Sequence, residues 1–115
     1  MTMMSDISTV KQYFDTLDQR FNYDASKGMN ACFQFELTGD GGGTYCVNVE
    51  DGEMSIAEGE NENPSLTITI TADNYLKLAH GKLNGQMAVM TGKMKVKGNM
   101  SLAMKMKQLF PIIKN

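Results

Sequence analysis

The chain has 115 residues, of which 42% are hydrophobic and 21% charged, and its formal net charge is −2. This length is typical of one domain with one core, so we expect a single domain over residues 1–115. No apolar run approaches the roughly 20 residues that cross a bilayer, and the start of the chain lacks a secretory-signal pattern, which favours a cytoplasmic protein.

The first half of the chain predicts one helix followed by four strands. Apolar residues at helical spacing predict an amphipathic helix from Ser5 to about Arg20, and Asp24 to Gly28 is typical of a turn. The period then changes to two, which is typical of half-buried strands. The alternating apolar positions are Phe33, Phe35 and Leu37, then Tyr45, Val47 and Val49, then Met54 and Ile56, and finally Leu66, Ile68 and Ile70.

The turns between these strands predict how the two cysteines are placed. Asp51-Gly52 is typical of a tight hairpin turn, and a polar loop covers Glu58–Pro64. A hairpin centred on Gly41 would place Cys32 opposite about Glu50 and Cys46 opposite about Glu36, beyond disulfide reach. We therefore expect two free thiols.

The second half predicts two helices, a fifth strand and a last helix. Thr71 is a suitable N-cap for a helix that ends near Gly81, and Gln86–Met90 predicts a short helix. Lys93–Lys97 alternates lysine with apolar residues, and a last helix runs from about Asn99 to Phe110. Strands followed mainly by helices indicate an α+β fold with one sheet face covered.

The sequence does not predict an enzyme. His80 is the only histidine and ends a helix, where favourable interaction with the helix dipole is its simplest role. Cys32 and Cys46 have neither a metal-site nor a redox spacing, and Gly39–Gly43 lacks the lysine and helix of a phosphate-binding loop. We expect no catalytic residue, no metal and no cofactor.

Methionines concentrate in the second half, where six of the eleven lie between Met87 and Met106. On the last helix, a broad apolar arc contains Leu102, Ala103, Met106, Leu109 and Phe110, with Met100 and Met104 on its flank. Methionine suits surfaces that accommodate variable apolar partners, but it also fills ordinary cores. Methionine content alone leaves both interpretations open.

Charge is also unevenly distributed. Before Pro64 there are twelve acidic and three basic residues, and from Pro64 onward there are one acidic and eight basic residues. Lys93, Lys95 and Lys97 share one face of the fifth strand, so we expect either transient docking on an anionic membrane or internal balance against the acidic half. We expect no nucleic-acid partner.

Residues 71–110 read TADNYLKLAHGKLNGQMAVMTGKMKVKGNMSLAMKMKQLF. This segment resembles the sterol carrier protein type-two family, most clearly in Gly81–Asn84, in Gly92-Lys93 and in the run Lys97–Lys105. The first half is similar too, at Phe33–Phe35, Tyr45 and Asp51-Gly52. The resemblance implies a five-stranded, largely antiparallel sheet with helices on one face and an apolar tunnel between them.

The resemblance also implies a function and its residues. The tunnel would bind a fatty acid, fatty acyl-CoA, sterol or phospholipid for transfer, without catalysis. An alternative is an accessory protein that presents a lipid-like intermediate, such as a quinone precursor, to enzymes. The implied ligand-binding residues are Phe33, Phe35, Met87, Met90, Met94, Val96, Met100, Leu102, Met106 and Phe110.

Three departures from the family pattern affect ligand choice and setting. Gly85 stands where a proline is common, and Val89 where an aromatic residue is common. The peroxisomal C-terminus of the animal forms is absent, which favours a free-standing microbial type. The identity of the lipid therefore stays open.

Overall fold

The computed structural model describes residues 7–113. Its elements, in chain order, are α1 (Val10–Asp15), two 3-10 helices (Leu17–Gln19 and Asp24–Ser26), β1 (Asn30–Thr38), β2 (Gly43–Glu50), β3 (Glu53–Glu58), β4 (Leu66–Thr71), α2 (Ala72–Ala79), α3 (Gly85–Met90), β5 (Met94–Gly98) and α4 (Met100–Leu109). Within this part of the chain, no helix combines the length and apolar character needed to traverse a membrane.

The five strands form one sheet in the order β3-β2-β1-β4-β5. Three of the four pairings are antiparallel, and β1 with β4 is parallel. The parallel pair arises because the chain leaves β3 at one edge and crosses two strands to reach β4. The prediction of a five-stranded, largely antiparallel sheet is confirmed.

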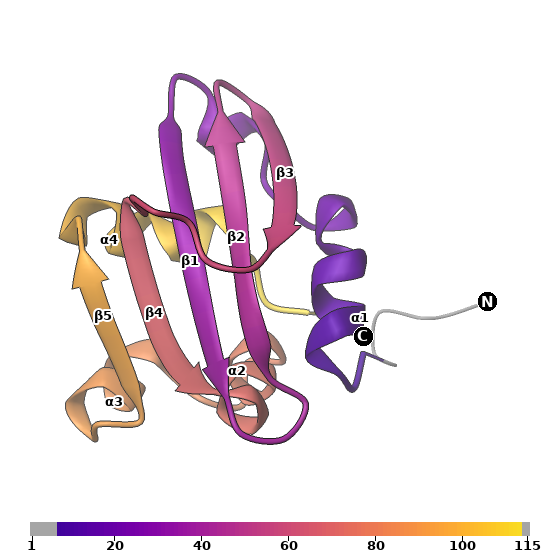
Figure 1. The fold of residues 1–115 in the computed structure, drawn as a ribbon, viewed down its shortest axis with the longest axis vertical. Coiled ribbons are helices and arrows are strands. Elements are labelled where there is room, and N and C mark those ends of the chain that lie inside the picture. Colours follow the sequence, from indigo (N-terminus) through magenta and orange to yellow (C-terminus); the bar gives the residue numbers. More distant parts are fainter. Residues whose placement is uncertain (1–6, 114–115) are drawn as a thin grey trace.

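The two faces of the sheet differ in chemistry because side chains alternate along each strand. The inner face carries the buried residues Phe33, Phe35, Val47, Leu66 and Ile68, and the helices pack behind it (Figure 1). The outer face is crossed by the segment between β3 and β4, which passes in front of β2 and β1 in Figure 1. Gln34 holds that segment, because its Oε1 accepts a hydrogen bond from the Asn61 backbone N–H at 2.8 Å.

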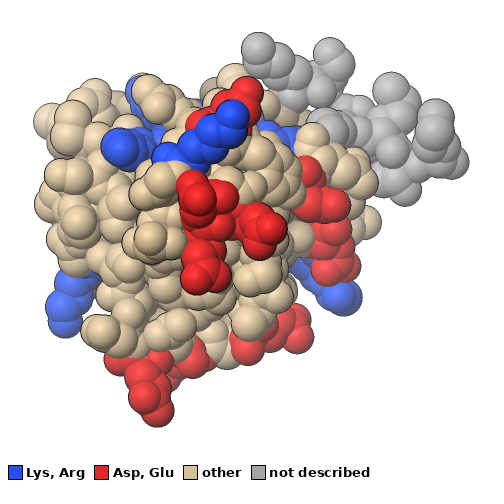
Figure 2. All heavy atoms as spheres, turned by 90° about the horizontal axis from the view of Figure 1, so that it is seen from above, with Lys and Arg blue, Asp and Glu red and all other residues tan. Residues whose placement is uncertain are grey.

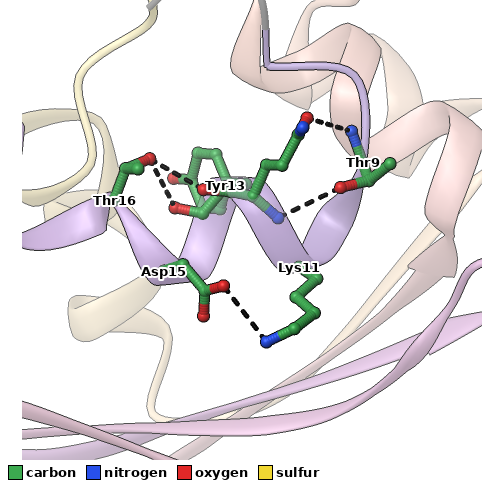
Figure 3. A network of polar contacts seen from close by, with 6 residues as sticks. Thr9, Lys11, Tyr13, Asp15 and Thr16 are labelled. Atoms are coloured by element: carbon green, nitrogen blue, oxygen red, sulfur yellow. Dashed lines mark hydrogen bonds and ion pairs between the residues drawn. The ribbon is translucent and has the colours of Figure 1, made fainter. Parts of the chain in front are cut away.

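The first helix is shorter than the predicted span from Ser5 to Arg20, whose first two residues lie outside the described part. Thr9 forms a capping box with Gln12, so the helix begins at Val10 (Figure 3). The Thr16 hydroxyl donates to the Gln12 carbonyl at 2.7 Å, and α1 ends at Asp15. Side-chain hydrogen bonds to the backbone compete with helix continuation, which periodicity alone does not reveal.

The register of the first hairpin also differs from the prediction. Cys32 lies opposite Asn48, and Cys46 opposite Gln34, two residues away from the predicted pairing. The turn is centred nearer Asp40, with Gly42 N–H donating to the Gly39 carbonyl at 3.1 Å. Both cysteines are free and buried, but they lie diagonally on the outer face rather than far apart.

The remaining elements follow their predicted positions closely. Asp51 and Gly52 both have positive φ, 44° and 83°, as a type I′ turn requires. Side-chain caps begin the later helices: Thr71 caps α2, Asn84 caps α3 and Asn99 caps α4. These caps fix the residues at which the helices begin after the preceding strand or loop.

Candidate functional site

A layer of aromatic rings lies between the inner sheet face and the helices. Phe110, the residue after α4, has its ring centroid 5.6 Å from that of Phe33 and 5.7 Å from that of Phe35. Phe35 continues the layer to Tyr75 of α2 at 5.5 Å. Tyr75 in turn lies 5.1 Å from Tyr13 of α1. This continuous apolar layer, from Phe110 to Tyr13, is the candidate site.

The ten residues implied as ligand-binding divide into two groups. Seven pack into or against the core of this layer, and they are Phe33, Phe35, Met94, Val96, Leu102, Met106 and Phe110. The other three face solvent: the exposed fractions are 53% for Met87, 80% for Met90 and 58% for Met100. The structure thus brings the sheet residues and α4 together, while the α3 methionines and the first α4 methionine lie outside.

The structure does not show the tunnel that the resemblance implies, and two hollows among the described residues lie away from this layer. A hollow of about 220 Å³ lies between α1 and β3, lined by Phe14, Asp15, Asp18, Met54, Ser55 and Ile56. A second, of about 390 Å³, is lined by Asn30, Ala31, Cys32, Asn48, Val49 and Glu50 of the β1–β2 hairpin. Neither is lined by any of the ten implied residues. Ring contacts involving Phe110 fill the layer instead.

Arg20 is a residue of interest that sequence reasoning missed. Its guanidinium carbon lies 4.7 Å above the Tyr13 ring, at the end of the aromatic layer. Nη2 donates to the Tyr13 carbonyl at 2.9 Å and Nη1 to the Thr16 hydroxyl at 2.9 Å, whereas Nε is buried and has no partner within residues 7–113. One signal was available, because Arg20 is the only arginine in the sequence and it directly precedes the buried Phe21.

The other titratable groups near the layer have structural roles. Burial raises the pKa of Tyr13 and raises the pKa of Tyr75 well above its ordinary value, so both hydroxyls stay neutral near neutral pH. His80 Nε2 lies 2.8 Å from the Ile7 carbonyl oxygen, which ties the end of α2 to the segment before α1. Within the described residues, no group of three or more His, Cys, Asp or Glu side chains is arranged to hold a metal.

The sequence of this chain is similar to those of several known proteins. The model of the SCP-2 sterol transfer family matches residues 11–111. The bovine hydroxysteroid dehydrogenase-like protein 2 is 35% identical over 101 residues, which cover 87% of this chain and 24% of that protein. Human sterol carrier protein 2 is 36% identical over 86 residues, covering 72% of this chain and 16% of that protein. The chain thus spans about a quarter or less of these relatives' length.

Solved structures of similar fold include proteins that span nearly the same length. The sterol carrier protein domain 2 of Helicoverpa armigera is 26% identical, with a TM-score of 0.68 and coverage of 84% of each chain. Palmitated SCP2L2 from Aedes aegypti is 18% identical, with a TM-score of 0.73, covering 94% of this chain and 99% of that one. At 18% identity, the similarity to the Aedes aegypti protein shows a shared fold only.

Proposed function

Because this chain belongs to the SCP-2 sterol transfer family, whose model matches residues 11–111, we propose that it binds one apolar lipid between its sheet and α4 and transfers it unchanged. The observation that carries the proposal is the aromatic layer from Phe110 to Tyr13, together with Met94 of β5 and Met106 of α4, which pack against the core. The palmitated Aedes aegypti protein of the same fold supports a fatty acyl chain as the ligand class.

Apolar burial supplies enough free energy for a useful carrier. A chain of about fourteen methylenes gains about 11 kcal/mol on burial. Association costs at least about 4 kcal/mol of translational and rotational freedom, so the expected dissociation constant is about micromolar. This affinity allows release as well as capture, and no covalent chemistry is needed.

Binding requires the layer to open, and α4 is the element best placed to move. Phe110 fills the space between Phe21, Phe33 and Phe35, with ring centroids 5.5–5.7 Å away. Leu102, Ala103 and Met106 on the same helix are only partly buried. An acyl chain that displaces Phe110 would therefore exchange one set of apolar contacts for another, and methionine side chains adapt well to such exchange.

The carboxylate of a fatty acid would lie at the Arg20 end of the layer. The buried Nε of Arg20 is a donor without a partner in the described residues, and a carboxylate is its natural acceptor. The aromatic side chains of Tyr13, Tyr75 and Phe35 then border the first part of the acyl chain. This arrangement orients the ligand with its head group near α1 and its tail near α4.

The ligand itself is the direct test. Purified protein is extracted with organic solvent, and the extract is analysed by mass spectrometry. Fatty acids or phospholipids in the extract support the proposal, and a prenylated aromatic compound would support the accessory role instead. Displacement of a bound fluorescent fatty acid then measures affinity, and absence of saturable binding up to hundreds of micromolar would contradict lipid binding.

A further inference from the structure

The apolar side chains that remain exposed cluster on two helices. Seven large hydrophobic side chains are exposed in the described part of the chain, and five of them are on α3 and α4: Met87, Val89, Met90, Met100 and Met104. Met104 is 82% exposed, because α4 turns Leu109 and Met106 toward the sheet and Met104 away from it. Exposed apolar groups gathered in this way are typical of an interaction surface.

The same region carries charge of one sign. Residues 85–109, here called the edge surface, contain Lys93, Lys95, Lys97, Lys105 and Lys107, all exposed, and no aspartate or glutamate. In Figure 2, acidic side chains lie in the middle, at the right, near the top centre and along the bottom of the view, with basic side chains between some of them. The upper left shows only basic residues among the charged ones, and the left is also the side of β5 and α4 in Figure 1.

The position of the edge surface in the fold leaves it open to a large partner. β5 is the outermost strand and pairs only with β4, and α3 and α4 lie at its two ends (Figure 1). Lys95 and Lys97 point to the outer face, while Met94 and Val96 pack inward. Lysines on an edge strand discourage sheet extension by a second strand, and a symmetric dimer through this surface would bring like charges together.

We propose that the edge surface docks on an anionic lipid bilayer, with the exposed side chains of α3 and α4 inserted among the head groups and the lysines bound to lipid phosphates or carboxylates. An unbranched apolar side chain flanked by lysines matches the boundary between head groups and acyl chains. The edge surface has no exposed aromatic residue and no arginine, which are the usual stacking and bidentate groups for nucleic acid.

The inference deepens the proposed function, because α4 takes part in both. Its buried side covers the candidate lipid site with Met106, and its exposed side presents Met104 to the bilayer. Docking thus places the helix that must move during ligand exchange against the membrane that supplies or receives the ligand. Each lysine near such a surface contributes about 1 kcal/mol of attraction, so attachment is weak and reversible.

Vesicle binding tests the proposal directly. Protein is sedimented with vesicles of phosphatidylcholine alone and of equimolar phosphatidylcholine and phosphatidylserine. We expect binding to the anionic vesicles only, weakened by salt. The variant Lys93→Glu with Lys97→Glu should bind roughly tenfold or more weakly, and Val89→Ser with Met104→Ser should also reduce binding.

The matched control changes the net charge by the same amount, but at residues outside the edge surface. Lys11→Glu with Lys27→Glu alters two exposed lysines of the acidic half, whose side chains are 72% and 76% exposed. If this control lost as much binding as Lys93→Glu with Lys97→Glu, overall charge would explain the effect and the proposal would be wrong. Equal binding to both vesicle types, or a dimer in solution that Val89→Ser with Met104→Ser dissociates, would also overturn it.

A second readout separates docking from lipid binding in solution. The affinity for a fluorescent fatty acid without vesicles is measured for each variant. The variants at Val89, Lys93, Lys97 and Met104 should keep the wild-type affinity while transfer to anionic vesicles slows. If the wild-type protein did not bind the fatty acid, the proposed function would be wrong. Sedimentation with vesicles would still test docking independently.

Discussion

Arg20 shows how a single side chain can connect the helix end, the aromatic layer and the proposed ligand. Two of its nitrogens satisfy groups at the end of α1, and its plane lies over the Tyr13 ring. The third nitrogen, Nε, is buried without a partner in residues 7–113. A buried donor of this kind costs free energy until an acceptor arrives, so Arg20 gains most from a ligand that carries negative charge.

Substituting Arg20→Met should therefore weaken binding of a fatty acid roughly tenfold, because a charge-assisted hydrogen bond is lost. Methionine keeps an apolar stem of similar length over the Tyr13 ring. The affinity for the fatty alcohol of equal chain length should change little. Arg20→Lys should bind the fatty acid more tightly than Arg20→Met, because lysine keeps a positive charge. If the fatty acid and the alcohol lost affinity equally, Arg20 would contribute packing rather than charge recognition.

Met106 and Met104 are two residues apart on α4 but differ in environment, which makes them a matched pair. Met106 packs against the core, and Met104 is 82% exposed. Met106→Lys should abolish fatty-acid binding and lower the free energy of unfolding by about 1 to 3 kcal/mol, because an unpaired ammonium is costly to desolvate. Met104→Lys should leave both quantities nearly unchanged. Denaturant titration and displacement of a fluorescent fatty acid measure the two effects.

At the scale of elements, the sequence predicted correctly those features that depend on interactions between neighbouring residues. The cap Thr71 and the turn at Asp51-Gly52 lie where the sequence indicates, since each depends on neighbouring residues only. The first helix was predicted too long because side-chain hydrogen bonds of Thr9 set its start and those of Thr16 accompany its end. The hairpin register was wrong by two residues because several glycines allowed alternative turns.

Part of the candidate site could also be predicted, because some of its residues belong to segments with a clear local pattern. Phe33, Phe35 and Met106 belong to strongly periodic segments, and they do face the core. Met100 was assigned to the flank of the apolar arc, but the orientation of α4 is fixed by Leu109, which is fully buried. That rotation depends on tertiary packing, which helical periodicity does not specify. Arg20 was missed because its importance lies in burial and stacking rather than in a motif.

Gly98 joins β5 to α4, and its conformation holds the strand against β4. It has φ +118°, and a Cβ there would lie 2.5 Å from the Ser65 carbonyl oxygen. Backbone strain alone should cost Gly98→Ala about 1 to 3 kcal/mol of stability. The total loss should be larger, because β5 must also shift. Gly92→Ala is the control, because Gly92 has φ +78° and nothing within 4 Å of an added Cβ.

Thermal and denaturant unfolding of the two variants separate strain from contact. Gly92→Ala should cost about 1 to 2 kcal/mol, the conformational penalty of a left-handed residue. Amide exchange in Met94–Gly98 should rise specifically in Gly98→Ala, because the β4–β5 pairing is loosened. Equal destabilisation by the two substitutions would show that the contact with Ser65 is unimportant for this edge.

Across the whole molecule, apolar and polar side chains lie on different faces of the sheet. The inner face of the sheet holds the apolar layer, and the outer face is polar and crossed by the segment that Gln34 holds. The cationic edge surface includes α4, and acidic residues lie mostly in the first half of the chain. This asymmetry would suit the proposed carrier, because one orientation at a membrane would present the helix that covers the proposed lipid site.

Alkaline pH should destabilise the whole fold through groups buried in their neutral form. Burial raises the pKa of Tyr75 well above its ordinary value and also raises that of Tyr13. Burial, together with the nearby Cys46 thiol, raises the pKa of Cys32 from 9.0 to about 11. The unfolded chain releases these protons first, so their contribution to stability is complete below about pH 9 and is lost as pH rises through the folded-state pKa values.

The unfolding midpoint of the wild-type protein should thus be level near neutral pH and fall between about pH 9 and about pH 11. Tyr75→Phe keeps the ring contacts with Tyr13 and Phe35 but removes one ionisable hydroxyl, so its midpoint should fall less steeply over that range. Tyr23→Phe is the control, because Tyr23 is 38% exposed and its hydroxyl is therefore not buried in its neutral form. If Tyr75→Phe and Tyr23→Phe followed the same slope as wild type, ionisation of Tyr75 would not drive the alkaline transition, and the loss would have to come from the other buried groups.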